Sequence, residues 1–451
     1  MRIVIAGAGR VGGTVAEALT EEGHDVTIID RDSELISHIS NDLDAICIEG
    51  SATDVDVLKE ADTGNADMFL AITEADEINL VCSVLAKNMG VDHIIARLRN
   101  TEYLGKEAYV KQALGISLLS NPELLCAKEI SRMIQFRGAS FATTFTGGNA
   151  EILKYKVHAG DKLCGTKVRD TKLITNSDTL ICYIINEDGV FIPPADYVYC
   201  ANDVIAITGN FSNLKKFYNS VVPRSKKIKN IMIYGGGRIV VYLARILLKT
   251  GIEVTIIDEN RARCERLCEL VPHAHIVCGD GTKRDVMLEE GILEADAYIA
   301  LTNDDGNNII TSIYAKHCDV GIVISKTEHV HFADLMEVSI IDKIITPKIL
   351  AARQIVGYVR AINNSLSQEI ESIYYLEEGQ LEALEFKIKN DSAVVGVPLM
   401  ELNIRKDIKI AAIIRNSTTM VPTGSSIIEK GDAVVIIAQT DEIKKLEDIL
   451  A

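Results

Sequence analysis

The second half of the chain repeats the first half, and this duplication limits the possible folds more than any other feature of the sequence. The stretch around Gly7 resembles the stretch around Gly235, at an offset of 228 residues. At the same offset, the string Val26–Asp30 recurs unchanged as Val254–Asp258. Each copy is about 225 residues long, so the 451-residue chain must fold as two versions of one structural unit.

Each copy begins with about 138 residues in which short apolar segments alternate with amphipathic ones. In the first copy, the segments expected to form strands are Arg2–Ala6, Asp25–Asp30, Ala45–Ile48, Asp67–Ile72, His93–Leu98 and Ser117–Leu119. The stretches Val11–Thr20 and Asp76–Met89 are expected to form helices between them. Strands that alternate with helices predict βαβ units and a parallel sheet. The first module of each copy is therefore predicted to be a Rossmann-like α/β domain.

The rest of each copy is predicted to be a smaller α+β module. In the first copy it contains strand-like segments at Ile152–Val157, Thr179–Ile185 and Asp203–Thr208, and a short helix near Asn213–Ser220. Turn signals separate these segments, which distinguishes them from the helix-connected strands of the first module. The fold class is thus a tandem duplication of a Rossmann-like parallel-sheet domain followed by a small α+β domain.

Three segments are expected to join or divide these modules. A helix should start at Pro122, since proline is favoured in a first helical turn, and run to about Arg137. Residues 147–149 (Gly-Gly-Asn) mark a break, and the basic run 224–229 is interpreted as a solvated linker rather than a binding patch. The predicted domains are residues 1–138 and 139–222 in the first copy, and 229–370 and 371–451 in the second.

The composition is that of an acidic protein without a membrane span. The net charge is −17, from 47 basic and 64 acidic residues, which excludes a nucleic-acid binder that needs basic patches against phosphate. No apolar run approaches the roughly 18–20 residues that cross a bilayer, and the N-terminal apolar stretch is too short for a signal peptide. We therefore expect a cytoplasmic protein whose ten cysteines are reduced thiols.

The strongest local motif is Gly7-Ala8-Gly9-Arg10-Val11-Gly12, a complete G-x-G-x-x-G sequence. It follows a predicted strand, opens a predicted helix, and precedes Asp30 at the end of the next strand, which is the full context of a dinucleotide site. The glycines would permit a tight turn, close approach of a pyrophosphate, and close packing of helix on strand. Asp30 would bind a ribose and favours NAD(H) over NADP, whereas ATP and ADP stay open, as does an empty scaffold.

The second copy keeps part of this motif. The corresponding residues are Gly235, Gly236, Gly237, Arg238 and Ile239, with Asp258 as the acidic residue. Val240 replaces the third glycine and Tyr234 replaces the alanine before the first, so helix and strand should pack less closely. An empty scaffold is therefore a stronger alternative for the second copy than for the first.

Arg10 and Arg238 occupy the same position, directly after the second glycine of each copy. A cation at a helix N-terminus opposes the helix dipole, so its presence in both copies suggests a phosphate partner, with an incidental surface arginine as the alternative. If Arg10 meets the third phosphate of ATP, Arg10→Ala should remove any preference for ATP over ADP.

The carboxyl ends of the predicted strands should complete the pocket, because ligands of open α/β sheets bind there. These ends are Gly50–Asp54, Thr73, Glu74 and Arg97–Arg99 in the first copy, and Gly279–Lys283, Thr302, Asn303 and Lys326 in the second. Ser51, Thr53 and Thr73 among them could contact adenine, ribose or phosphate. For the serine and the threonines, helix capping is an equally good explanation.

No catalytic or metal-binding motif accompanies the nucleotide motif. The chain has no G-x-S-x-G, H-E-x-x-H or P-loop sequence. In the first copy, no His or Tyr follows the fourth or fifth predicted strand in a position from which it could serve as the acid or base of hydride transfer. Three pairs lack a second ligand pair at zinc-like spacing: His273/His275, His329/His331 and Cys264/Cys268. We therefore expect neither an enzyme nor a bound metal.

With this module order and these motifs, the whole chain resembles the tandem RCK (KTN, or TrkA-type) family of cytosolic regulatory subunits of Trk-type potassium uptake systems. The resemblance implies that NAD(H), and ATP or ADP, bind the Rossmann-like modules and shift the conformation of a ring, typically a homotetramer. It implies a membrane potassium transporter of TrkH/TrkG type as the partner, which would hold the protein at the inner face of the plasma membrane. The small modules resemble TrkA-C (RCK-C) domains, and the helix from Pro122 would form a dimer contact.

The same resemblance implies nucleotide contacts at particular positions. Those in the first copy are residues 7–11, Asp30, Thr73, Glu74 and Leu98, and those in the second are residues 235–239 and Asp258. Two other functions stay open: an NAD-dependent oxidoreductase, and a ligand-gated regulator of a potassium efflux or antiport protein.

Overall fold

A computed structural model describes residues 1–103, 105–136, 139–145, 150–222, 228–328, 341–365, 370–377, 380–388, 392–416, 418–439, 443 and 445–451. The chain forms two compact units, and each unit contains one part of each copy of the repeat. Unit 1 (Met1–Ser131 and Ile228–Val356) holds both Rossmann-like modules, and unit 2 (Arg132–Lys227 and Gly357–Ala451) holds both small modules. The end of the helix at Arg137, the break at 147–149, the run 224–227 and the pair His329/His331 lie outside the described residues.

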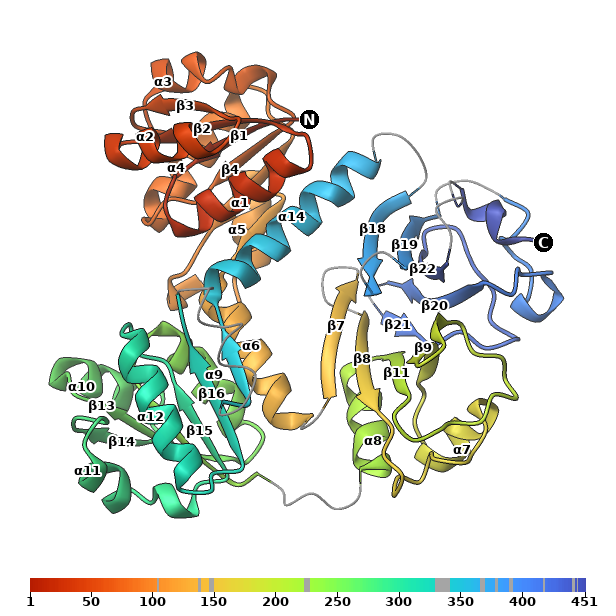
Figure 1. Ribbon diagram of the computed structural model, residues 1–451. Helices are drawn as coiled ribbons and strands as arrows, with labels where there is room; N and C mark the ends of the chain where they lie inside the picture. Colours follow the sequence, from red (N-terminus) through yellow and green to blue (C-terminus); the bar gives the residue numbers. More distant parts are fainter. Residues whose placement is uncertain are drawn as a thin grey trace. The chain divides into compact units, whose positions relative to one another are not determined.

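The first Rossmann-like module has six parallel strands in the order β3-β2-β1-β4-β5-β6. Figure 1 labels β1 to β4 of this sheet. The strands are β1 (Arg2–Ala6), β2 (Asp25–Asp30), β3 (Ile46–Glu49), β4 (Met68–Ala71), β5 (His93–Arg97) and β6 (Leu118–Ser120). The helices are α1 (Arg10–Glu21), α2 (Ser33–Asp42), α3 (Val55–Glu60), α4 (Asp76–Asn88) and α5 (Glu107–Leu114). This strand order is that of a doubly wound Rossmann fold, and it confirms the predicted fold class.

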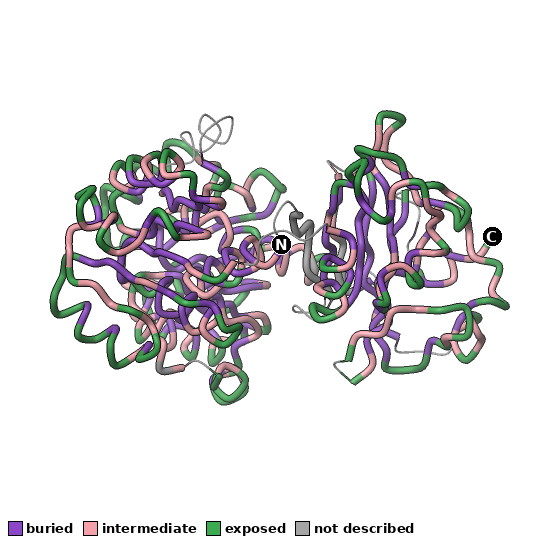
Figure 2. The backbone as a smooth tube through the Cα atoms, turned by 90° about the horizontal axis from the view of Figure 1, so that it is seen from below, coloured by how far each residue is buried: buried purple, intermediate pink, exposed green. Residues whose placement is uncertain are grey.

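The apolar runs form buried strands because a parallel sheet is covered on both faces. Ile3 and Ile5 of β1 are at most 1% exposed, and the buried strands are visible in purple in Figure 2. In α1, Val11, Val15 and Leu19 recur every four residues and are all buried, so one stripe of the helix packs on the sheet.

The second Rossmann-like module repeats this topology, with strand order β14-β13-β12-β15-β16-β17. The strands are β12 (Asn230–Tyr234), β13 (Glu253–Asp258), β14 (His275–Cys278), β15 (Ala297–Ala300), β16 (Ile322–Lys326) and β17 (Lys343–Ile345). The helices are α9 (Arg238–Leu248), α10 (Arg261–Leu270), α11 (Arg284–Glu289) and α12 (Asp305–His317). The duplication predicted from the sequence is thus present in the fold.

Within unit 1, a tyrosine of the second module is anchored in the first module. The Tyr242 hydroxyl in α9 donates to the carbonyl of Arg99 at 3.0 Å and accepts from Nδ2 of Asn121 at 3.0 Å. Its side chain is 2% exposed, so burial and two hydrogen bonds tie α9 to the segment before α6 (Pro122–Gln135). The equivalent helix of the second copy, α14 (Pro347–Ser365), also begins in unit 1.

The small modules in unit 2 are antiparallel sheets with matching topology, β10-β9-β11-β8-β7 and β18-β19-β22-β20-β21. The first contains β7 (Ala139–Phe145), β8 (Ala150–Lys156), β9 (Leu180–Asn186), β10 (Gly189–Phe191) and β11 (Val204–Gly209), with α7 (Thr171–Thr175) and α8 (Phe211–Val221). The second contains β18 (Ile370–Leu376), β19 (Leu381–Lys387), β20 (Ile408–Arg415), β21 (Thr418–Met420) and β22 (Ala433–Ala438). The sequence prediction missed β7 and β10.

The two small modules share one hydrophobic core. Ile152, Tyr183 and Ala206 of the first cluster with Leu381, Ala412 and Val435 of the second. At the edge of this core, the Tyr183 hydroxyl donates to Glu377 at 2.7 Å, and Lys154 forms an ion pair with the same carboxylate. Among the described residues, no helix is long and apolar enough to cross a membrane.

Candidate functional site

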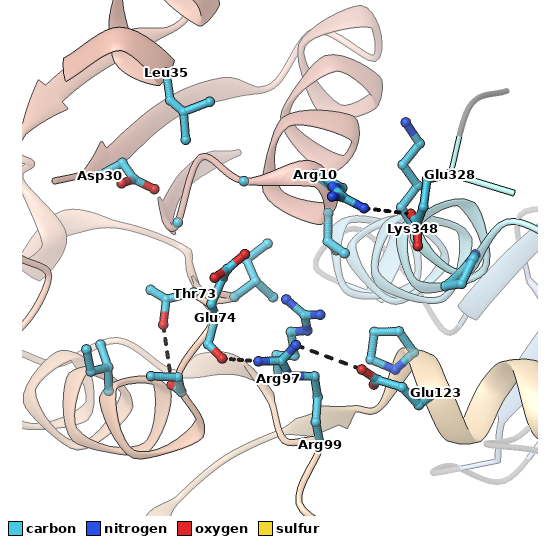
Figure 3. Close-up of a pocket in the computed structure, with 18 of the residues that line it drawn as sticks. Arg10, Asp30, Leu35, Thr73, Glu74, Arg97, Arg99, Glu123, Glu328 and Lys348 are labelled. Atoms are coloured by element: carbon cyan, nitrogen blue, oxygen red, sulfur yellow. Dashed lines mark hydrogen bonds and ion pairs between the residues drawn. The ribbon is translucent and has the colours of Figure 1, made fainter. Parts of the chain in front are cut away.

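A cavity of about 830 Å³ opens in unit 1, at the carboxyl ends of strands from both Rossmann-like modules. The N-terminal ends of α1 and α9 both line it, together with the first residues of α6 and α14. The two copies therefore contribute to one cavity, whereas the sequence suggested one site in each copy. Figure 3 shows side chains from both modules pointing toward this space.

The loop between β1 and α1 has the tight turn and the close packing that were expected from the glycines of the motif. Gly7 has a φ of +111°, and a Cβ there would lie 2.9 Å from the carbonyl of Ile72. A Cβ on Gly12 would lie only 1.8 Å from the carbonyl oxygen of Gly7, so α1 docks directly on the loop. Gly9 faces open space and lines the cavity. The loop thus leaves the N-terminus of α1 accessible to an anion.

Asp30, at the end of β2, is positioned by the loop it faces. Its Oδ2 accepts from the N–H of Ala8 at 2.6 Å, and its Oδ1 accepts from the N–H of Asp32 at 3.0 Å. The carboxylate lines the cavity and is half-buried, so it retains lone pairs that could accept further hydrogen bonds. Next to it, Nη2 of Arg31 donates to Oγ of Ser51 at 2.6 Å.

A buried asparagine fixes the next two strand ends. Oδ1 of Asn79 accepts from the N–H and the hydroxyl of Thr73 at 2.8 and 2.7 Å. Its Nδ2 donates to the carbonyls of Thr73 at 3.1 Å and Arg97 at 3.0 Å. The side chain is 0% exposed and all its hydrogen-bonding groups are used. It therefore holds the loop of Thr73 and the end of β5 in fixed positions beside the cavity.

Two arginines follow at the end of β5. Arg99 donates to the carbonyl of Glu74 and lies 3.9 Å from Glu123 at the start of α6, as the dashed lines in Figure 3 indicate. Arg97 lines the cavity, and its buried Nε has no hydrogen-bond partner among the described residues. Burial, and then the neighbouring Arg99, lowers the pKa of Arg97. A cation in this state would be stabilised by an anionic ligand.

In the second copy, the start of the helix is built differently. Gly235 has a φ of +105°, and its N–H donates to the carbonyl of Ile257 at 2.8 Å, just as the N–H of Gly7 donates to the carbonyl of Ile29.

The difference lies at the position of the third glycine. Val240 is fully buried there, and its N–H donates to the carbonyl of Gly237 at 3.1 Å, which tightens the first turn of α9. Gly237, Arg238 and Ile239 nevertheless line the shared cavity.

In the second module, side chains of the module itself occupy the surroundings of the equivalent aspartate, Asp258. Asp258 is 2% exposed, and its Oδ2 is paired with Nη1 of Arg263 at 2.8 Å. The Tyr234 ring packs on Gly281, where a Cβ would come within 2.4 Å of the ring, and burial raises the pKa of this tyrosine to about 12. Of the two equivalent aspartates, only Asp30 of the first copy thus lines the cavity.

The structure brings most of the predicted contact residues of the first copy together. Those that line the cavity are Gly7, Gly9, Arg10, Val11, Asp30, Ser51, Thr73 and Glu74, with Gly237, Arg238 and Ile239 from the second copy. Those outside its lining are Ala8, Gly12, Leu98, Gly235, Gly236, Asp258 and Thr302. Leu98 is 4% exposed and packs in the core. The contact role of each residue stays a prediction.

Several lining residues were not singled out from the sequence. They are Arg31 and Leu35 after β2, Glu123 and Lys348 at the starts of α6 and α14, and Glu328 after β16. The sequence signal was available for two of them, because Glu123 and Lys348 each follow the proline that is repeated between the copies.

The cavity has an excess of positive charge in a chain whose net charge is −17. Among the described lining residues, seven are cationic and five are acidic. Such a local excess, with two helix N-termini, fits an anionic ligand of several charges. Within the described residues, no group of three or more His, Cys, Asp or Glu side chains is arranged to hold a metal. All ten cysteines are free.

Comparison with known proteins identifies both kinds of module. The TrkA-N domain family matches residues 3–122 and 231–347, and the TrkA-C domain family matches residues 383–451. The Trk system potassium uptake protein TrkA homolog of Archaeoglobus fulgidus is 33% identical over 452 residues and covers 100% of both chains. The Trk system potassium uptake protein TrkA of Vibrio alginolyticus is 30% identical over 443 residues, 97% of this chain and 95% of its own.

Solved structures share the fold at lower identity. The GsuK RCK domain matches with a TM-score of 0.64 and 18% identity, and the match covers 98% of this chain and 92% of that one. The GsuK channel bound to NAD also has a TM-score of 0.64 and 18% identity, with 98% and 77% covered. The two TrkA-N matches together cover more than half of the chain. The chain therefore belongs to the TrkA family of Trk system potassium uptake proteins.

Proposed function

We propose that this protein is a cytosolic, nucleotide-binding regulatory subunit that gates a membrane potassium uptake transporter of TrkH/TrkG type, and that it is not an enzyme. In this proposal, four chains form a ring at the inner face of the membrane, held there by the transporter. The proposed modules are residues 1–138, 139–222, 229–370 and 371–451. The proposal rests on family membership and on the charged cavity shared by the two Rossmann-like modules.

The observation that carries the nucleotide assignment is the asymmetry of this cavity. The first copy supplies a glycine loop and an accessible carboxylate, Asp30, while the corresponding Asp258 is buried and paired with Arg263. The second copy supplies a helix N-terminus and cations, including Arg238 and Lys326. This arrangement fits one nucleotide per chain, NAD(H) or ATP/ADP, with its ribose on the first copy and its phosphates between the copies.

A ligand held by both modules can act as a signal. It shifts a conformational equilibrium only by its different affinity for the two conformations. Because the cavity is lined from both sides, any change in the spacing of the two modules alters the number of cations that reach the phosphates. Ligands with different phosphate charge would therefore favour different spacings, and the ring could transmit this difference to the transporter.

The central test is nucleotide binding by wild type and by Asp30→Ala. We expect NADH, NAD, ATP or ADP to raise the melting temperature of the wild type, because a ligand of the folded state stabilises it. Asp30→Ala should weaken binding about 10- to 100-fold, since a charged hydrogen bond contributes roughly 1.5–3 kcal/mol. Thermal-shift titration with each of the four nucleotides measures both effects.

Asp258→Ala is the matched control. It removes the equivalent carboxylate, which is paired with Arg263 and lies outside the cavity lining, so stability should fall while nucleotide affinity changes less than about threefold. No thermal shift with any nucleotide would refute the nucleotide assignment. Steady NADH consumption with a panel of small molecules would favour the oxidoreductase instead.

Arg10 and Arg238 give a second test, because both line the cavity at equivalent helix starts. Among the described residues, Arg238 has no ion-pair partner, whereas Nη1 of Arg10 lies 3.5 Å from Glu328. We expect each Arg→Ala change to weaken ATP binding more than ADP binding, by about five- to tenfold at Arg238 and less at Arg10, which is already partly neutralised. Calorimetric titration with ATP and ADP measures both ratios, and equal losses for the two nucleotides would contradict the assignment.

A further inference from the structure

The two copies carry opposite charges at one equivalent position of the cavity. After β5, Arg99 is held by its N–H, which donates to Oδ2 of Asp76 at 2.9 Å. After β16, the N–H of Glu328 donates to Oδ2 of Asp305 at 2.9 Å in the same way. Equivalent aspartates thus fix the backbone of the two loops, yet the residue they hold is a cation, Arg99, in the first copy and a carboxylate, Glu328, in the second.

The Glu328 carboxylate lies between cations from both modules. Its Oε2 is 3.5 Å from Nη1 of Arg10, and its Oε1 is 3.4 Å from Nζ of Lys326. The side chains of Glu328 and Lys326 are only 20% and 7% exposed, whereas that of Arg10 is 72% exposed. Figure 3 shows Arg10 and Glu328 pointing toward each other beside Lys348. All four residues line the cavity.

We propose that Glu328 is a specificity-determining residue that competes with the ligand's phosphates for Arg10 and Lys326. This inference rests on the proposed function, since it assumes that the cavity binds a nucleotide. The carboxylate provides the negative charge that these cations need while the phosphates are absent. A phosphate that approaches Arg10 must displace the carboxylate or accept its repulsion, and both reduce affinity.

The penalty should grow with the length and charge of the phosphate chain. A nucleoside monophosphate can place its single phosphate at the glycine loop and the N-terminus of α1. A triphosphate carries more negative charge and extends farther toward the second copy, where Glu328 lies. Unit charges a few ångströms apart interact strongly at a partly buried site, so one carboxylate can alter affinity by an order of magnitude. Glu328 would therefore reduce the preference for ATP over AMP.

The experiment compares AMP, ADP and ATP on full-length wild type and Glu328→Gln by calorimetric titration. Glutamine keeps the side-chain size and the backbone N–H contact to Asp305, and circular dichroism confirms folding. We expect ATP affinity to rise about tenfold, ADP affinity by an intermediate factor, and AMP affinity less than about twofold. Added salt should diminish the gain, because it screens charges.

Two controls separate this effect from a general change in charge. Glu60→Gln removes a carboxylate at the exposed end of α3, outside the cavity lining, and should leave the ATP-to-AMP affinity ratio unchanged. In an Arg10→Ala background, Glu328→Gln should raise ATP affinity by a smaller factor, because one of the two cations for which Glu328 competes with the phosphates is absent.

The outcomes distinguish a failure of this inference from a failure of the proposed function. Nucleotide binding with an ATP-to-AMP ratio that Glu328→Gln does not change would overturn this inference and leave the proposed function standing. Binding of no nucleotide to wild type or variant would overturn the proposed function and this inference with it.

Discussion

Gly12→Ala is expected to lower the free energy of unfolding of unit 1 by roughly 3 kcal/mol or more and to abolish nucleotide-induced stabilisation. The added Cβ would stand 1.8 Å from the carbonyl oxygen of Gly7, and backbone cannot rotate away as a flexible side chain can. Helix α1 must therefore move off the loop, and its N-terminus moves with it. Urea unfolding followed by circular dichroism measures the loss, because the chain has no tryptophan for fluorescence.

Gly9→Ala is the matched control in the same loop. Gly9 has a φ of −65°, and a Cβ there would meet nothing within 4 Å. We expect a loss of less than about 1 kcal/mol in stability, from a poorer N-cap residue, together with weaker nucleotide binding because the methyl group enters the cavity. If Gly12→Ala proved as stable as Gly9→Ala, α1 would be able to adopt the tightened first turn that α9 forms around Val240.

The positions of strands could be predicted from the sequence where short apolar runs lie between polar turns. The predicted Arg2–Ala6 and Asp25–Asp30 coincide with β1 and β2, and the other predicted strands of this module overlap observed ones. The missed strands lack this signal: β7 has the sequence Ala-Ser-Phe-Ala-Thr-Thr-Phe, and β10 has three residues. Pairing with neighbouring strands, rather than local pattern, makes these segments β-structure.

The candidate site was predictable as far as it depends on local sequence. The glycine loop and Asp30 are placed by one βαβ unit, so the motif located them correctly at the cavity. The joint cavity depends on contacts between residues more than a hundred positions apart, such as Tyr242 with Arg99, which no local pattern encodes. The pairing of Asp258 in the second copy had a signal in Arg263, five residues later, but only the structure shows their ion pair.

Two buried asparagines, one in each copy, were also missed in the sequence. Asn79 and Asn308 make equivalent hydrogen bonds, to Thr73 and Arg97 in one module and to Thr302 and Lys326 in the other. Asn79 lies in α4 and Asn308 in α12. An asparagine in an amphipathic helix is usually taken to lie on the polar, exposed face. Each instead joins two strand ends whose following residues line the cavity, so the repeated amide is a structural requirement of the site.

Asn79→Leu should therefore have a large effect, about 3–5 kcal/mol in the free energy of unfolding. Leucine is of similar size but cannot hydrogen-bond, so the N–H and carbonyl of Thr73 and the carbonyl of Arg97 would lose their partner in a partly buried place, at roughly 1–3 kcal/mol each. Urea unfolding measures the loss. Asn65→Leu is the control, because Asn65 is exposed and, among the residues that the structure describes, its side chain bonds only Asp62. A change within about 0.5 kcal/mol is expected there. Equal stability of the two variants would mean that the loops of Thr73 and Arg97 are held by packing alone, and nucleotide affinity would then be unaffected by Asn79→Leu.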